Sequence, residues 1–322
     1  MGYATAKKIN KTSISVVDIT PLRDGTDPTS VAKKLHAAST GLGFIYIKGH
    51  GIPTKVINNA RNSAYEFFRS SEKQKSSISI SSEHRGWIGT GGAKMADDAK
   101  PDLKESFLWG FDNAHLTDHP LRGQNQWPMS QPDLKNCTMD YFQHVHDVAH
   151  HLMRGFAIGL GLDADFFLKT SNAPLSRGSY VYYPNQPEEL GEDQFGVGPH
   201  TDFGVLTVLA QDDVGGLQVQ TNDGEWIEAP PIGGTLIVNV ADLLHRWTDG
   251  AFKSTPHRVI NRSDRERLSL VLAFDPNPET IIDARDVFGK ECSTFEKPIT
   301  CGEYLTWRFD RAFTYRKDNQ NE

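Results

Sequence analysis

The chain has 322 residues, of which 38% are hydrophobic and 23% charged, and its formal net charge is -7. This composition is ordinary for a soluble protein that can bury a substantial core in one large domain or two smaller ones. The net acidity argues against nucleic-acid binding, and no apolar run approaches the roughly 18 residues of a membrane helix. The first residues lack the apolar core of a secretory signal, so we expect a cytoplasmic protein.

The N-terminal part alternates short strands and helices. We expect strands at 14–19 and 44–47, and helices from about 29 to 39 and from 53 to 69. Residues 71–132 are the least regular stretch, although aromatic side chains run through it. An irregular stretch of this length inside a compact domain usually has a function, so we interpret it as a lid over a site.

The character of the sequence changes after residue 132. A long amphipathic helix is expected at about 134–160, and a last helix at about 301–313. Between them lie short β-rich runs separated by Gly, Pro, Asn and Asp, at 180–183, 205–210, 217–220, 226–228, 236–240, 257–261 and 268–274. Strands at this spacing predict a mainly β fold with flanking helices and a jelly-roll core. We divide the chain into an N-terminal region (13–132), a helical support (133–176), a core (177–300) and a C-terminal helix with its tail (301–322).

A candidate metal site starts from His200 and Asp202. On an extended segment these two side chains share one face, because side chains alternate along a strand. His257, which follows Asp202 after 54 intervening residues, would complete the two-histidine, one-carboxylate set that suits non-haem Fe(II). With 12 histidines in the chain a His-x-Asp pair alone is weak evidence. The three cysteines show no CxxC spacing, so any metal here should have nitrogen and oxygen ligands.

A second candidate site follows the strand series. Arg267 and Ser269 alternate on one predicted strand and so face the same way. A guanidinium can donate two parallel hydrogen bonds to a carboxylate, and a hydroxyl can add a third. Together with a metal that keeps open positions, this pair describes a pocket for an oxoacid.

These features occur in an order that resembles the Fe(II)/2-oxoglutarate-dependent oxygenases of the isopenicillin N synthase-like family. The resemblance covers nearly the whole chain. It is carried by the sequences at 17–19, 43–53, 85–87, 102–105, 182–184, 200–202, 215–219, 254–259 and 267–269. Several motifs in the right order are far more specific than any one of them.

The resemblance implies a double-stranded β-helix core with His200, Asp202 and His257 as iron ligands. It also implies that 2-oxoglutarate chelates the iron, while Arg267, Ser269 and Tyr183 hold its far carboxylate. The implied reaction uses O2 and converts 2-oxoglutarate to succinate and CO2 while it oxidises a C–H bond of a small organic molecule. Hydroxylation is the default outcome, but desaturation, ring closure and ring expansion occur on the same scaffold.

The sequence departs from the family pattern at two places near the expected pocket. Val181 stands where plant members commonly have Asn, and Ala273, followed by Phe274, stands where many relatives have Phe. The smaller Ala273 suggests a larger or differently shaped pocket. The residues that we expect to contact substrate are Trp87, Phe107, Phe111, Phe203, Ala273 and Phe274, although Trp87 could equally be a core residue.

Three other interpretations stay open at this point. Isopenicillin N synthase and the aminocyclopropane carboxylate oxidase use the same triad without 2-oxoglutarate. A catalytically silent binding protein could keep the fold, and two His with one carboxylate also suit catalytic zinc. The sequence does not identify the substrate, and amino acids, nucleobases, terpenoids, polyketides and alkaloids all remain possible.

Overall fold

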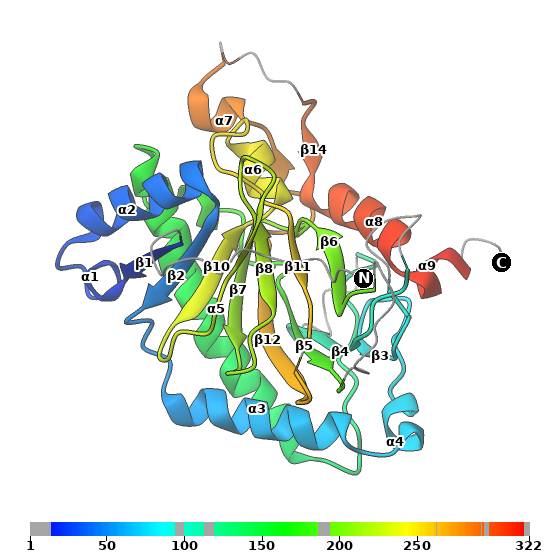
Figure 1. Cartoon of the computed structure of the whole chain (residues 1–322). Coiled ribbons are helices and arrows are strands. Elements are labelled where there is room, and N and C mark those ends of the chain that lie inside the picture. The colour runs from blue at the N-terminus through cyan, green and yellow to red at the C-terminus, as the bar shows by residue number, and fades with distance from the viewer. Residues whose placement is uncertain are drawn as a thin grey trace.

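The computed structural model describes residues 14–93, 100–112, 119–185, 194–261, 263–290, 292 and 296–318. Two facing β-sheets form the centre of this part of the chain, with helices packed around them (Figure 1). The strands are β1 (Ser15–Asp18), β2 (Phe44–Lys48), β3 (Gly86–Ile88), β4 (Glu105–Gly110), β5 (Arg177–Tyr183), β6 (Val197–His200), β7 (Leu206–Gln211), β8 (Leu217–Gln220), β9 (Trp226–Glu228), β10 (Leu236–Val240), β11 (His257–Val259), β12 (Arg267–Phe274), β13 (Ile281–Ile282) and β14 (Ile299–Thr300).

The helices lie mainly before the core strands and at the C-terminal end. They are α1 (Thr20–Arg23), α2 (Pro28–Gly41), α3 (Thr54–Phe68), α4 (Glu72–Ser76), α5 (Asp133–Gly159), α6 (Asp242–Trp247), α7 (Arg285–Phe288), α8 (Cys301–Ala312) and α9 (Thr314–Asp318), with a 3-10 turn at Phe166–Leu168. None of those in the described ranges has the length and apolarity needed to cross a bilayer.

The larger sheet has the strand order β1-β2-β10-β7-β12-β5-β4-β3, and the smaller sheet has the order β6-β11-β8-β9. The mainly β, jelly-roll core predicted from the strand spacing is therefore confirmed. Strands from the N-terminal region complete the larger sheet, because β2 pairs with β10 and β4 pairs with β5. Among the core strands, the sequence pattern missed β6, which carries Pro199. It also placed the start of β5 at residue 180, although the strand begins at Arg177.

The register of the larger sheet fixes where polar side chains meet. Arg267, at the start of β12, pairs with Tyr183 of β5. At the other end of β12, Ala273 pairs with both Arg177 of β5 and Thr207 of β7. Six residues of strand separate these two levels, which is about 20 Å. Between these two levels the inner face of the sheet carries small and apolar side chains, among them Ser269, Val271, Ser179 and Val181.

Helices α2, α3 and α5 cover the outer face of the larger sheet, where Figure 1 shows α5 running behind the strands. The apolar stripe of α5 is fully buried against them, as its amphipathic spacing predicts. Gly159 allows close contact with α2, because a Cβ atom there would lie 2.9 Å from the carbonyl oxygen of Ala32. Both faces of the larger sheet are thus covered.

The stretch 71–132 is more regular than expected. It contains α4, β3 and β4, and the last two extend the larger sheet at its edge. Hydrogen bonds of the sheet hold both β3 and β4, and Lys104, Ser106 and Leu108 line the pocket, so the interpretation of this stretch as a lid stays a prediction. Residues 94–99 and 113–118 of the stretch lie outside the described residues.

Candidate active site

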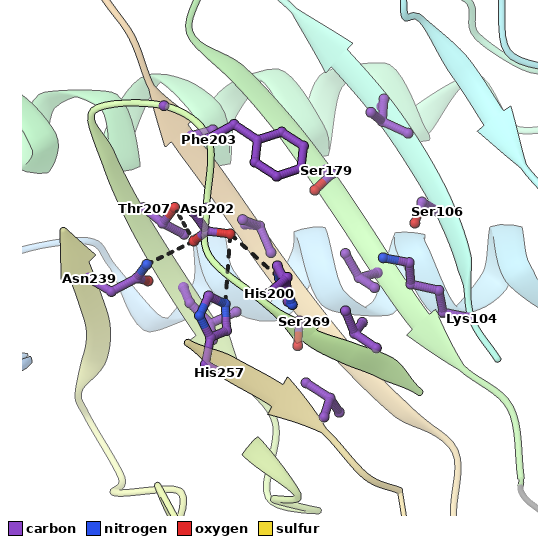
Figure 2. Close-up of a pocket in the computed structure, with 18 of the residues that line it drawn as sticks. Lys104, Ser106, Ser179, His200, Asp202, Phe203, Thr207, Asn239, His257 and Ser269 are labelled. Atoms are coloured by element: carbon purple, nitrogen blue, oxygen red, sulfur yellow. Dashed lines mark hydrogen bonds and ion pairs between the residues drawn. The ribbon is translucent and has the colours of Figure 1, made fainter. Parts of the chain in front are cut away.

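A pocket opens between the two sheets and contains the predicted metal-binding side chains. Its walls come from the inner face of the larger sheet, from β6 and β11 of the smaller sheet, and from α8. Figure 2 shows His200, Asp202 and His257 converging on one side of this pocket. Within the described ranges, this triad is the group of His, Cys, Asp and Glu side chains whose ligand atoms lie close enough to hold one metal ion.

The triad has the geometry of a metal site. The Oδ1 atom of Asp202 lies 3.7 Å from Nε2 of His200 and 3.7 Å from Nε2 of His257. The three ligand atoms all lie within 4.8 Å of one another, so a single ion can contact them together. One sequence expectation needs correction. His200 and Asp202 do not share a strand, because β6 ends at His200 and Asp202 lies in the following turn.

The atoms of the triad that face away from this centre all have hydrogen-bond partners. The Asp202 Oδ2 atom accepts hydrogen bonds from Thr207 Oγ1 at 2.6 Å and from Asn239 Nδ2 at 2.8 Å (Figure 2). The Nδ1 atom of His200 is 2.8 Å from the Gly198 carbonyl, and that of His257 is 3.2 Å from the Thr255 carbonyl. A carbonyl only accepts, so each Nδ1 must donate, which leaves the Nε2 lone pairs for a metal.

The electrostatics of the triad keep its ligands ready to bind a cation. Burial lowers the pKa of His200 to about 3, with a further contribution from His257. Burial alone would raise the pKa of Asp202, but His257, His200 and the hydrogen bonds from Asn239 and Thr207 lower it to about 2. A neutral imidazole and an ionised carboxylate are the forms that coordinate metals.

At the end of the pocket opposite the triad, Arg267 is a buried cation, and two of its nitrogens have no hydrogen-bond partner within the described residues. Its side chain is fully buried, and its Nε donates to the Gly215 carbonyl at 2.6 Å. Neither Nη1 nor Nη2 has a hydrogen-bond partner in the described structure. An unpaired buried guanidinium is costly, so this arrangement fits an anion that the protein binds. The two Nη atoms of a guanidinium match the two oxygens of a carboxylate.

Ser269 and Tyr183 lie beside Arg267. Ser269 follows Arg267 on the same face of β12 and lines the pocket, as Figure 2 shows. The guanidinium of Arg267 lies 4.6 Å from the centre of the Tyr183 ring. Burial raises the pKa of the Tyr183 hydroxyl to about 12, so it stays protonated and can donate a hydrogen bond. These residues and Arg267 form a receptor that fits a carboxylate.

An ion pair just before β4 contacts β6, the strand that carries His200. Asp102 is buried, and its Oδ1 accepts a hydrogen bond from the Gly198 amide at 3.0 Å. Its other oxygen lies 3.3 Å from Lys104 Nζ, and Lys104 points into the pocket (Figure 2). Because the carbonyl of the same Gly198 holds His200, this pair helps to fix the metal-side wall.

Beyond the triad the pocket has an aromatic and charged end. Phe203 and Ala273 line it, as expected, together with Arg177 and Phe309. Arg177 forms an ion pair with Asp275, which is fully buried. The other oxygen of Asp275 accepts a hydrogen bond from the Val205 amide at 3.1 Å, in the turn that follows Asp202. Asp275 thus contacts both the far end of the pocket and the turn that holds the metal-facing carboxylate.

Four of the expected substrate contacts lie elsewhere, and the strand alternation explains why. On β4, Ser106 and Leu108 line the pocket, so Phe107 points to the opposite face and packs against Phe67. Trp87 also lies away from the pocket lining, and its Nε1 donates a hydrogen bond to Glu105. Phe111 packs on Phe142 and His146, and Phe274 packs on His146 and His150. For these four residues the structure corrects the expectation.

Several pocket residues were not singled out from the sequence, although some gave a signal. Asn239 is the polar residue within an otherwise apolar strand, which is unusual for a central strand. Lys104 belongs to a motif of the resemblance, but no role was assigned to it. Arg177 and Thr207 gave no signal, because their approach to the pocket depends on the register of β5 and β7 with β12.

Replacing Asn239 with leucine should weaken metal binding while the fold is kept. The change removes one of the two hydrogen bonds that hold Asp202 Oδ2, so the carboxylate loses its fixed orientation. We expect a fall in Fe(II) affinity of about 10–100-fold, the usual effect of losing a group that orients a ligand. Competition with a coloured chelator measures this affinity. Asn222→Leu, at an exposed position, is the control, and equal affinities in both variants would contradict the assigned role.

Two family models match the chain. Residues 175–276 match the 2OG-Fe(II) oxygenase superfamily, and residues 14–130 match the N-terminal region described as that of a non-haem dioxygenase in morphine synthesis. The first match contains the triad and Arg267, and the second contains Asp102 and Lys104. The two matched regions together include the strands that line the pocket, whereas α8 lies outside both of them.

Individual proteins also resemble the chain over most of its length. A probable iron/ascorbate oxidoreductase of Dictyostelium discoideum is 36% identical over 90% of this chain and 90% of its own. A homoarginine-6-hydroxylase of Glycine max is 32% identical over 91% of this chain and 95% of its own. Among solved structures, a full-length Neurospora crassa protein in complex with alpha-KG and thymine has a TM-score of 0.83 at 28% identity, over 93% of this chain and 98% of that one.

Proposed function

We infer, because the chain belongs to the 2OG-Fe(II) oxygenase superfamily, that His200, Asp202 and His257 hold its Fe(II) and that Arg267 anchors its 2-oxoglutarate. The protein is an Fe(II)- and 2-oxoglutarate-dependent dioxygenase that hydroxylates its substrate, with O2 as cosubstrate.

The observation that supports this assignment best is the unpaired guanidinium of Arg267. A fully buried cation whose two Nη atoms have no partner within the described residues fits an anionic cosubstrate. The alternative enzymes that do without 2-oxoglutarate, and the silent binding protein, are not favoured by the relatives that the chain resembles. A zinc hydrolase leaves the Arg267 receptor without a role.

When bound, Fe(II) and 2-oxoglutarate supply the oxidant by activating O2 with release of succinate and CO2. The protein contributes orientation and exclusion of water. The hydrogen bonds at the Nδ1 atoms of both histidines fix the imidazole rings, and Thr207 and Asn239 fix the carboxylate. Apolar side chains between the triad and Arg267 keep water from the middle of the pocket, among them Val181, Leu209, Val259 and Val271.

The substrate is a small organic molecule that enters beside Phe203, at the end of the pocket away from Arg267. This end is lined by Phe203, Phe309, Ala273 and Arg177, and apolar and aromatic walls with a small number of placed polar groups are typical of small-molecule sites. The names of the relatives support this class, since they refer to homoarginine and to thymine. The acidic net charge agrees with a substrate that is not a nucleic acid.

Coupled product analysis tests the proposed function. With a turned-over substrate, the Fe(II)-loaded protein should release one succinate for each hydroxylated product, and chelation of iron should stop both. Substrate turnover without succinate would point to an oxidase of the aminocyclopropane carboxylate type. Full activity with zinc in place of iron would point to a hydrolase. Either result would overturn the assignment.

A further inference from the structure

We propose that Arg177 is the substrate-orienting residue, and that it binds a ring carbonyl of a flat, uncharged substrate. This inference deepens the proposed function and rests on it, because it names the class of molecule that enters the far end of the pocket.

The guanidinium of Arg177 is fixed but only partly used. One of its nitrogens, Nη1, binds the buried carboxylate of Asp275, and its flat face lies 4.7 Å from the centre of the Phe309 ring. No hydrogen bond occupies its Nε or Nη2 within the described ranges, and the residue lines the pocket. A held guanidinium with free N–H groups is a pre-organised donor for an oxygen atom of a ligand.

The position of Arg177 separates it from the cosubstrate receptor. Arg177 pairs with Ala273, six residues along β12 from Arg267, which is about 20 Å of strand. On the other side of β12, Ala273 pairs with Thr207, whose hydroxyl contacts Asp202. Arg177 therefore lies at the same level of the sheet as the triad and far from the receptor formed by Arg267. The substrate has to be held at the level of the triad, beside the metal.

The charge around Arg177 favours an uncharged acceptor over a carboxylate. Asp275 is fully buried and already neutralises the guanidinium. A substrate carboxylate at Arg177 would therefore bring a second negative charge close to a buried one. His84 adds no cation, since burial and then Arg177 hold its pKa well below the ordinary range. A cationic substrate is also disfavoured. Among the described residues that line the pocket the acidic side chain is Asp202, and Asp202 is assigned to the metal, so no carboxylate of the lining is left to pair with a cation.

The walls beside Arg177 favour a flat ring. Phe203 and Phe309 line this end with their ring centres 6.0 Å apart, and Figure 2 shows the Phe203 ring turned toward Ser179. Ala273, directly across from Arg177 in the sheet, has only a methyl group, so a ring can lie next to the guanidinium. His84 and Arg177 already lie against the Phe309 ring, and Arg308 lies over the Phe203 ring. The pocket-facing side of Phe203 and the fixed donor together recognise the face and the edge of a planar heterocycle.

Binding of matched probes to the anaerobic Fe(II)- and 2-oxoglutarate-loaded protein tests the proposal. The probes are two neutral rings that carry a ring carbonyl, thymine and 2-pyridone; their carboxylated counterparts, uracil-5-carboxylate and 6-oxo-1,6-dihydropyridine-3-carboxylate; and the cation homoarginine. The visible charge-transfer band of the loaded protein reports probe binding and shows in the same sample that 2-oxoglutarate is bound. We expect at least one neutral ring to bind, and to bind more tightly than its carboxylated counterpart or homoarginine.

Variants at the ion pair distinguish recognition from structural support. Arg177→Gln should weaken binding of the neutral ring about tenfold or more, and Arg177→Lys, which can keep the ion pair, should lose part of that affinity. Asp275→Asn should shift the preference toward the carboxylated ring, because the guanidinium then lacks its counter-ion. Arg154→Gln, which changes an exposed arginine paired with Asp165, is the control and should bind every probe as the wild type does.

The outcomes separate the two proposals. If the charge-transfer band does not form, the proposed function fails. If the band forms, three results would overturn the role of Arg177 alone. No neutral ring binds, the carboxylated rings or homoarginine bind the wild type more tightly than the neutral rings do, or Arg177→Gln retains full affinity for the neutral ring. An unchanged preference in a folded Asp275→Asn protein would also contradict the charge argument.

Discussion

Asp202→Ala is expected to abolish iron binding and all turnover while the protein stays folded. The carboxylate supplies one of the three ligand atoms, and its Oδ1 is the atom placed 3.7 Å from both Nε2 atoms. Loss of a group that only orients a ligand already costs about 10–100-fold in metal affinity, so the loss of the ligand itself should cost more than that. The fold should survive because the site lies at a pocket and is not part of the apolar core, which packs against α5.

Iron content after anaerobic loading and dialysis measures this effect, and near-ultraviolet circular dichroism checks the fold. Asp213→Ala is a matched control, since Asp213 is an exposed carboxylate that pairs with Arg265 on the surface. The control should bind iron as the wild type does. Wild-type iron content in a folded Asp202→Ala protein would contradict the assignment of the triad.

Arg267→Met should lower the affinity for 2-oxoglutarate on the order of 100-fold or more, without loss of iron. Truncating one partner of a buried charged pair usually costs about 2–5 kcal/mol in binding. Without 2-oxoglutarate, the Arg267→Met protein should be as stable as the wild type or more stable. The variant removes a buried cation whose Nη atoms have no partner in the described structure. A ligand stabilises only the state that binds it, so 2-oxoglutarate should raise the melting temperature of the wild type and not that of the variant.

Anaerobic titration of the Fe(II)-loaded protein with 2-oxoglutarate measures the affinity. Arg265→Met is a strict control, because it makes the same chemical change two residues away, at an exposed position. It should leave the affinity for 2-oxoglutarate unchanged. Similar affinities in Arg267→Met and Arg265→Met would show that the cosubstrate is anchored elsewhere.

The convergence of His200, Asp202 and His257 could be predicted from the sequence because motif order and strand spacing both carry information about it. The jelly-roll core was predictable for the same reason, since turn residues separate its strands at regular intervals. The turn that holds Asp202 was not predictable, because the alternation rule assumed a strand that in fact ends at His200.

Four of the six expected substrate contacts were misplaced, in part because both faces of the larger sheet are buried. In β4 the side chains of both faces are largely buried, with Ser106 and Leu108 on one face and Phe107 and Trp109 on the other, so the sequence of this strand does not show which set faces the pocket. A shift of one residue exchanges the two faces. For this reason Phe107 was as suitable as its neighbours. In β12, by contrast, alternation from Arg267 and Ser269 puts Ala273 on the pocket face and Phe274 on the opposite face, so the expectation for Phe274 went against the strand pattern.

The double contact of Asp275 has a thermodynamic consequence. One carboxylate binds Arg177 at the far end of the pocket and the Val205 amide in the turn behind Asp202. Any ligand that changes the free energy of the first contact can change that of the second, and such coupling is reciprocal. If substrate strengthens iron binding by some factor through this carboxylate, iron must strengthen substrate binding by the same factor. Substrate would then protect the enzyme against loss of its metal.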